Sequence, residues 1–358
     1  MIKEQEIINK IKNNIPTLFK STGFIKSTCI ESGVGERFYC FNPDIVIEVE
    51  TARKKKFLLI FEVKSTGQPR YVRMAVSQLK EIIANKKQCY GVFASTFISE
   101  ETRKICRESG IGFIDLAGNC FFNFDNVYLS IEGRPNPYPT TRPLKSIFYP
   151  KSSRVLRVLL CNPKKEWFVK DLAKEAETSL GQTSLIKNKL LEYEYLGVSS
   201  EKKRAKFWLK KPEELLSKWT TNYTYKKNKM KNYYSLDDVE TIEKKIVDYF
   251  NLKNITYAFT LNTGVSMVAP FLRYKKVFLY VFNDIAKIAK EMNFKEVSSG
   301  SNVILMEPYD EGVFYGLQMI KGVRVVSDIQ LYLDLNSYKE RGEEAAEFLL
   351  EERLRKQW

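Results

Sequence analysis

The stretch Asn42–Lys64, NPDIVIEVETARKKKFLLIFEVK, decides the fold of the N-terminal part of the chain. Two runs rich in β-branched and apolar residues flank the basic turn Arg53–Lys56, and this pattern predicts a β-hairpin. Antiparallel pairing would bring Asp44, near the start of the first strand, close to Glu62, near the end of the second. Glu62 and Lys64 are two residues apart, so they should project from the same face of their strand.

These three side chains predict a compact site for a hard divalent cation. Mg²⁺ favours one or two carboxylates, with water and phosphate oxygens as the remaining ligands. A lysine beside the ion can hold a phosphate or help to activate water. An alternative stays open, because a strand that ends in Glu-x-Lys is also typical of a solvated edge with a cross-strand ion pair.

Pro43-Asp44, followed after a hairpin by Glu62–Lys64, resembles the motif of the PD-(D/E)xK nuclease superfamily. The resemblance implies a restriction-endonuclease-like fold: a helix, a mixed sheet that carries the acidic motif, and a second helix, here over residues 70–84. It also implies that Asp44 and Glu62 bind Mg²⁺ and that Lys64 is the catalytic lysine. Gln78, on the second helix, would support the site.

Other parts of the N-terminal region fit this interpretation. Apolar residues at helical spacing predict an amphipathic helix over residues 2–20, and some branches of the superfamily add a glutamate from this helix. Glu6 is the nearest candidate for that role. Asp115 lies three residues before the turn dipeptide Gly118-Asn119, and we favour a turn-capping role for Asp115 and Asn119 over catalysis.

Length and composition limit the class of protein. A chain of 358 residues is long enough for two or three domains, and a net charge of +15 favours anionic partners. The absence of histidine excludes His-based general-base catalysis and His-ligated zinc. The six cysteines form no CxxC pair, which indicates reduced thiols in a cytoplasmic protein. No apolar run suggests a signal peptide or a membrane span, so a membrane partner is not expected.

The middle of the chain predicts a winged helix-turn-helix. Four prolines within 133–143 predict a stiff linker, after which three helices are expected over 152–160, 167–176 and 182–192. A hairpin over 196–210 would form the wing. The third helix and the wing tip carry residue types that contact base edges and phosphates. The expected DNA contacts are Gln182, Thr183, Ser184, Lys187, Lys189, Lys202, Lys203 and Arg204.

Positive charge is concentrated in the same region. Between Arg142 and Lys231 there are 22 Lys and Arg against 9 Asp and Glu, a net charge of +13 out of +15. A basic stripe on a helix-turn-helix is the electrostatic footprint expected of a DNA-binding protein. The apolar face of the third helix is predicted to consist of Leu185, Ile186, Leu190 and Leu191.

Three phrases resemble the AbiEi-type regulators of type IV toxin–antitoxin systems, in the branch with a nuclease-like N-terminal region. They are Gly110–Asn119, Thr263–Ser266 and Val326–Leu335. The resemblance implies a DNA-binding transcriptional regulator of the antitoxin kind, with a cognate toxin protein as a partner. Its C-terminal domain would be regulatory or would hold a homodimer together.

The expected fold class is therefore multi-domain α/β. We expect a nuclease-like domain over 1–132, a Pro-rich linker over 133–145, a winged helix over 146–211, a basic linker over 212–232 and a C-terminal α/β domain over 233–358. The first hypothesis is a regulator that reads double-stranded DNA. The alternative is a Mg²⁺-dependent DNA endonuclease that the winged helix directs to its target. A third interpretation is an antitoxin that acts through protein contacts alone.

Overall fold

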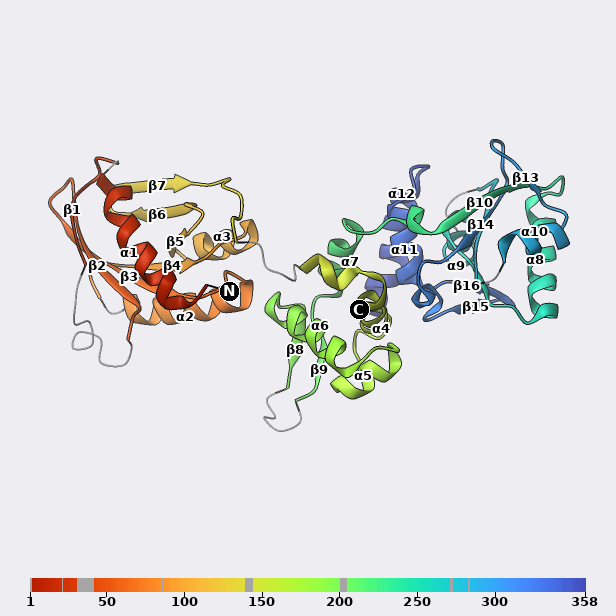
Figure 1. Cartoon of the computed structure of the whole chain (residues 1–358), viewed down its shortest axis with the longest axis horizontal. Coiled ribbons are helices and arrows are strands. Elements are labelled where there is room, and N and C mark those ends of the chain that lie inside the picture. The colour runs from red at the N-terminus through yellow and green to blue at the C-terminus, as the bar shows by residue number, and fades with distance from the viewer. Residues whose placement is uncertain are drawn as a thin grey trace. The chain divides into compact units, whose positions relative to one another are not determined.

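The computed structural model describes residues 2–20, 22–30, 42–84, 86–138, 144–199, 205–270, 273–282 and 284–358. The chain forms two compact units (Figure 1). Unit 1 comprises Met1–Pro143 with Glu192–Glu194, and unit 2 comprises Leu144–Leu191 with Tyr195–Trp358. The division falls within the predicted Pro-rich linker.

Unit 1 is a mixed sheet of seven strands with helices on both faces. Its strands lie side by side in chain order, from β1 to β7. The pairs β3–β4 and β4–β5 are parallel, and the remaining pairs are antiparallel. The elements are α1 (Glu4–Lys20), β1 (Ile25–Ile30), β2 (Ile45–Thr51), β3 (Lys56–Val63), α2 (Pro69–Ala84), β4 (Cys89–Ser95), α3 (Glu100–Glu108), β5 (Gly112–Asp115), β6 (Cys120–Phe124) and β7 (Val127–Ile131).

The predicted hairpin is formed by β2 and β3, which pair from Ile45↔Phe61 to Glu50↔Lys56. Alternate residues of both strands face opposite layers of the core. Ile47 and Phe61 pack with α1, whereas Val46 and Ile60 pack with α2 and α3. Because both faces of these strands are covered, they are apolar along most of their length.

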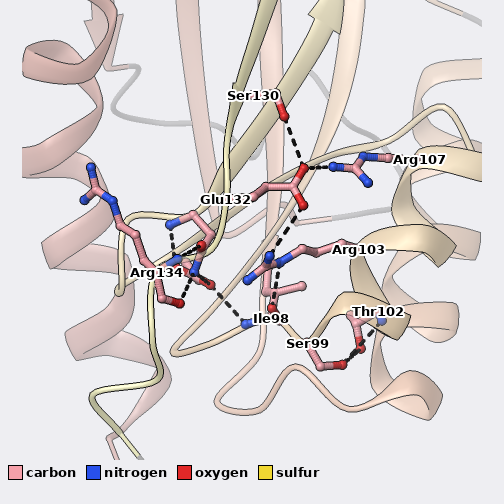
Figure 2. A network of polar contacts seen from close by, with 10 residues as sticks. Ile98, Ser99, Thr102, Arg103, Arg107, Ser130, Glu132 and Arg134 are labelled. Carbon is pink, nitrogen blue, oxygen red and sulfur yellow. Dashed lines mark hydrogen bonds and ion pairs between the residues drawn. The ribbon is translucent and has the colours of Figure 1, made fainter.

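The turn between β5 and β6 and the end of β7 are held by a polar network (Figure 2). Asp115 accepts hydrogen bonds from the backbone of Ile98 (3.1 Å) and from both nitrogens of Asn119 (2.9 Å each). Glu132 lies between the guanidinium groups of Arg103 and Arg107 (Figure 2). These contacts confirm the turn-capping role predicted for Asp115 and Asn119.

The first part of unit 2 has the order of elements expected of a winged helix. An isolated antiparallel bridge between Trp167 and Phe207 ties the start of α5 to the wing. The predicted wing residues Lys202, Lys203 and Arg204 lie outside the described residues. The elements are η2 (Leu144–Phe148), α4 (Pro150–Cys161), α5 (Val169–Glu175), α6 (Leu180–Glu192), β8 (Leu196–Val198) and β9 (Phe207–Leu209).

The second part of unit 2 is another seven-stranded mixed sheet, in the order β13-β10-β14-β12-β11-β16-β15. Helices α8 and α10 pack on one core with this sheet, and α11 contacts both α4 and α7. The elements are α7 (Pro212–Thr220), η3 (Tyr225–Lys227), β10 (Lys229–Tyr234), α8 (Val239–Lys253), β11 (Tyr257–Phe259), α9 (Leu261–Val268), β12 (Val277–Val281), α10 (Ile285–Glu291), β13 (Lys295–Glu296), β14 (Val303–Glu307), η4 (Glu311–Phe314), β15 (Gln318–Ile320), β16 (Val323–Val325), α11 (Asp328–Asn336), α12 (Gly342–Leu349), the π-helical turn η5 (Leu350–Leu354) and α13 (Arg355–Gln357).

The structure differs from the sequence prediction at residues 212–232. This segment is not a linker, because it forms α7, η3 and the first half of β10. Trp219 of α7 is fully buried and stacks on Phe148, with ring centroids 6.2 Å apart. The basic residues of the segment therefore lie on packed elements of unit 2.

The predicted mixture of α and β structure in several domains is confirmed. Among the described residues, every helix is too short or too polar to span a bilayer.

Candidate nuclease-like site and nucleic-acid interface

Unit 1 places Asp44 and Glu62 side by side at one end of the central hairpin. The pair Ile45↔Phe61 sets the register, so Asp44 stands opposite Glu62. The Asp44 Oδ2 atom accepts a hydrogen bond of 2.7 Å from the backbone N–H of Val63. This bond ties the carboxylate to the end of β3.

Lys64 and a glutamate from α1 complete the cluster. The Lys64 ammonium donates to Glu62, and its backbone N–H donates to the carbonyl of Ala94 on the neighbouring strand (3.0 Å). The glutamate is Glu4, whose Oε1 atom accepts a hydrogen bond of 3.1 Å from the backbone of Ser65. Glu6, the residue expected from the sequence, instead pairs with Lys10 on the exposed side of α1.

The protonation of the cluster reflects its partial burial. Burial raises the pKa of both Asp44 and Glu62, and the mutual repulsion of the carboxylates adds to this effect on Glu62. Burial lowers the pKa of Lys64, but the hydrogen bond to Glu62 and the attraction of the Glu62, Asp44 and Glu4 carboxylates together outweigh burial, so the pKa is raised. A divalent cation or a phosphate would therefore meet a preformed group of charges.

The donor set fits Mg²⁺ with a small number of protein ligands. In the part of the chain that the structure describes, no three acidic or cysteine side chains gather closely enough to hold one ion. Two carboxylates still suit Mg²⁺, which keeps several waters and takes phosphate oxygens. Gln78 is half-buried on α2, and its Oε1 atom has no hydrogen-bond partner among the described residues. It makes none of the contacts given above for Asp44, Glu62 and Lys64.

The third helix of the winged helix, α6, divides its residues between core and solvent. Thr183, Ile186 and Leu190 are buried, and the Thr183 hydroxyl donates to the carbonyl of Ser179 (3.0 Å). Thr183 therefore cannot reach a DNA base, which corrects the prediction from sequence. Leu185, predicted to be buried, is 54% exposed.

The other predicted contacts on α6 lie on or beside its outer side. The residues opposite the buried ones, before the last turn of the helix, are Gly181, Ser184, Leu185 and Asn188, a group called here the outer strip. The acidic Glu192, the last residue of α6, continues the same side beyond the outer strip. Lys187 and Lys189 lie on the two flanks of the outer strip and are both partly exposed. Gln182 is half-buried, and its Nε2 atom lies 3.3 Å from Ser152 Oγ at the start of α4.

The winged helix is joined to the second part of unit 2 by a buried polar network. The Arg157 guanidinium of α4 donates to Gln330 of α11 (2.7 Å) and lies 4.9 Å from the Trp219 ring. Gln330 in turn donates to the carboxylate of Asp334 (2.9 Å), which is fully buried. Nearer the surface, Arg154 donates to Asp310. The winged helix and the C-terminal sheet therefore form one compact body.

Fold and geometry thus define a protein in which an α/β unit with an acidic pair at the end of its central hairpin is followed by a winged helix built into a second α/β domain. Residues 208–355 match the family model described as "Transcriptional regulator, AbiEi antitoxin, Type IV TA system". The match confirms the predicted resemblance and contains two of the three phrases on which that resemblance was based.

Among solved structures, the chain is similar to the crystal structure of a repair endonuclease from Pyrococcus abyssi, with 18% sequence identity and a TM-score of 0.22. That similarity covers 32% of this chain and 47% of the endonuclease chain, so it spans about half of the endonuclease. None of the curated protein sequences compared with this chain matches it.

Proposed function

We propose that this chain is a DNA-binding transcriptional regulator of the type IV antitoxin kind, with α6 in the major groove of double-stranded DNA. The proposal is supported chiefly by one observation: the winged helix is built into the same compact unit as the antitoxin-family region 208–355. The charge distribution agrees, since the net charge of +13 between Arg142 and Lys231 suits a polyanion. A regulator of transcription would act in the cytoplasm.

The antitoxin family model suggests the protein partners. A cognate toxin is the proposed partner of the C-terminal part of unit 2, and a second copy of the chain would place two copies of α6 on successive half-sites. Neither partner is required for the DNA test that follows.

The test removes the two lysines that flank the outer strip. The double variant Lys187→Ala/Lys189→Ala should bind duplex DNA more weakly, because each lysine would neutralise one phosphate. The slope of log K against log salt should become shallower by about 2. A matched control is Lys287→Ala/Lys290→Ala, which removes two exposed lysines from α10. Fluorescence anisotropy of a labelled duplex at several salt concentrations measures both effects. Equal losses in the two double variants would count against the proposal.

A second candidate function is Mg²⁺-dependent cleavage of DNA by unit 1. The observation in its favour is the convergence of Asp44, Glu62 and Lys64, with Glu4 at its edge. Bound Mg²⁺ would supply electrostatic stabilisation to the scissile phosphate. Asp44 and Glu62 would hold the ion, and Lys64 would orient the phosphate or the attacking water.

Cleavage is tested with supercoiled plasmid and purified full-length chain in Mg²⁺ or Mn²⁺. Nicking that disappears in Asp44→Ala and persists in Glu81→Ala would support an enzyme, since Glu81 is an exposed acid on α2. Nicking at the same rate in both variants would point to a contaminating nuclease. An absence of nicking with either metal would leave regulation as the function.

A further inference from the structure

The outer strip of α6 carries no charged residue. Its members are a glycine, a serine, a leucine and an asparagine, although the helix belongs to the most basic part of the chain. Leu185 is 54% exposed, and Leu180 at the start of the helix is 56% exposed. A Cβ atom added at Gly181 would meet no heavy atom within 4 Å, so the N-terminal half of the strip is open.

A leucine at this position is not explained by the core. The buried side of α6 is complete with Thr183, Ile186 and Leu190, each less than 5% exposed. Leu185 lies on the opposite side, where an apolar side chain gains nothing from folding. Its position is explained if a partner covers it.

The surroundings favour DNA over a protein as that partner. Leu180 and Leu185 are five residues apart and do not share a face of α6, so they form no continuous apolar area, whereas a stable protein interface buries about 800 Å² on each side. Residues 146–211 carry 15 Lys and Arg against 7 Asp and Glu. An uncharged strip that carries one exposed leucine, with lysines on both flanks, suits the floor of the major groove, where thymine presents a methyl group between two phosphate backbones.

We propose that the outer strip of α6 reads A·T base pairs, with Leu185 packed on a thymine methyl group and Asn188 hydrogen-bonded to a neighbouring adenine. This inference rests on the proposed regulatory function and names the base pairs that the regulator recognises. Asparagine can bond to both N6 and N7 of adenine, and apolar side chains contact the thymine methyl group. Residues 185 and 188 are one helical turn apart and share a face, so they would address adjacent base pairs.

The neighbouring residues fit the same geometry. Gly181 has no side chain, which lets the N-terminal part of α6 approach the bases closely. Lys187 and Lys189 on the flanks would contact phosphates and add affinity without sequence preference. Base reading and phosphate binding would therefore be carried by different residues of one helix.

The experiment uses duplexes selected by the full-length chain from a random pool. We expect A·T pairs to be enriched at the centre of the selected sites. Each thymine there is then replaced by deoxyuridine, which removes only the 5-methyl group and leaves base pairing intact. The wild-type chain should bind the deoxyuridine duplex about 4-fold more weakly for each methyl contact that is lost.

Variants assign the effect to single residues. Leu185→Ala should bind the thymine duplex more weakly and should no longer distinguish it from the deoxyuridine duplex. Asn188→Ala should lose roughly 5- to 150-fold in its preference for adenine at one position. The matched control is Leu252→Ala on α8, a leucine that is 84% exposed in the same unit. Unchanged thermal melting of unit 2 would show that each variant is folded.

The outcomes separate this inference from the proposed function. Specific DNA binding with equal affinity for the thymine and deoxyuridine duplexes would overturn the proposed thymine contact. The same loss of affinity for the deoxyuridine duplex in Leu185→Ala as in the wild type would also overturn it. Neither result would contradict the proposed regulatory function. An absence of binding to any selected duplex would overturn both the inference and the proposed function. Loss of toxin binding in Leu185→Ala, with DNA binding unchanged, would assign the strip to a protein partner and overturn the inference.

Discussion

Replacing Asp334 by asparagine should flatten the pH dependence of the stability of unit 2. The Asp334 carboxylate is fully buried on α11 and accepts hydrogen bonds from the hydroxyls of Tyr223 (2.5 Å), Thr260 (2.5 Å) and Tyr280 (3.0 Å). Burial raises its pKa from 3.8 to about 6, although these hydrogen bonds act in the opposite direction. The folded state therefore holds the proton more tightly than the unfolded state does.

The sign and size of the effect follow from this difference. The stabilisation by the protonated carboxyl is fully present below pH 3.8 and is lost as the pH rises through about 6. At about 1.36 kcal/mol per pKa unit, the loss amounts to about 3 kcal/mol in the free energy of unfolding. Asparagine does not titrate. The stability of the variant relative to the wild type should therefore rise by about 3 kcal/mol from about pH 3 to about pH 8.

Tryptophan fluorescence is a selective assay for this effect. The four tryptophans, at positions 167, 208, 219 and 358, all belong to unit 2, so their emission reports the unfolding of that unit. Urea unfolding would be followed at several pH values for the wild type, Asp334→Asn and the exposed control Asp248→Asn. If the free energy of unfolding varied with pH in parallel for the wild type and Asp334→Asn, the raised pKa of Asp334 would be wrong. Such parallel profiles would show that Asp334 ionises in the folded protein as readily as in the unfolded chain.

Three other predictions concern the remaining buried and acidic groups. Asn119→Ala should destabilise unit 1 by about 1–3 kcal/mol, because it removes the side-chain amide that donates to the buried Asp115 carboxylate and leaves only the backbone donor of residue 119. Calorimetry should then show one shifted transition, with the tryptophan-monitored transition unchanged. Arg157→Ala should destabilise unit 2 by about 3–5 kcal/mol, because it breaks a fully buried charged network, and a wild-type urea midpoint would contradict this. Glu4→Ala should weaken Mn²⁺ binding measured by titration calorimetry, whereas Glu6→Ala should not.

The sequence predicted the central hairpin of unit 1 well, because alternation along a strand has an exact period of two. Once Asp44 and Glu62 were assigned to the two paired strands, their proximity followed from the antiparallel register. The contact between Glu4 and Ser65 could not be predicted in the same way. It depends on the angle at which α1 docks on the sheet, and nothing local in the sequence distinguishes Glu4 from Glu6.

Residue type misled the prediction for α6. Leu185 was assigned to the core because it is apolar, yet it lies opposite Ile186 and Leu190 on the helix. Thr183 was assigned to the surface because it is polar, although a threonine hydroxyl can bond to the carbonyl four residues earlier. At about 100° per residue, Thr183 lies on the same side of the helix as Ile186 and Leu190, whereas Leu185 does not. This helical spacing would have placed Thr183 in the core and Leu185 at the surface.

The segment 212–232 was misread for a different reason. Its lysines and tyrosines resemble a basic linker, but a strand near the edge of a sheet can pair its lysines with acidic residues of neighbouring strands. In β10, Lys229 and Lys231 pair with glutamates of neighbouring strands, while Tyr233 is buried. The partners, Glu296 and Glu307, lie more than 60 residues away in sequence, so the local sequence around β10 does not reveal them.

Site-specific photo-crosslinking tests the central claim, that α6 is the element facing DNA, most directly. Benzoylphenylalanine would be incorporated in place of Asn188 in one protein and in place of the exposed Leu252 in another, and each would be irradiated with a labelled selected duplex. A covalent adduct to DNA is expected from position 188 and none from position 252. Stable DNA binding by both proteins without an adduct from position 188 would contradict that claim.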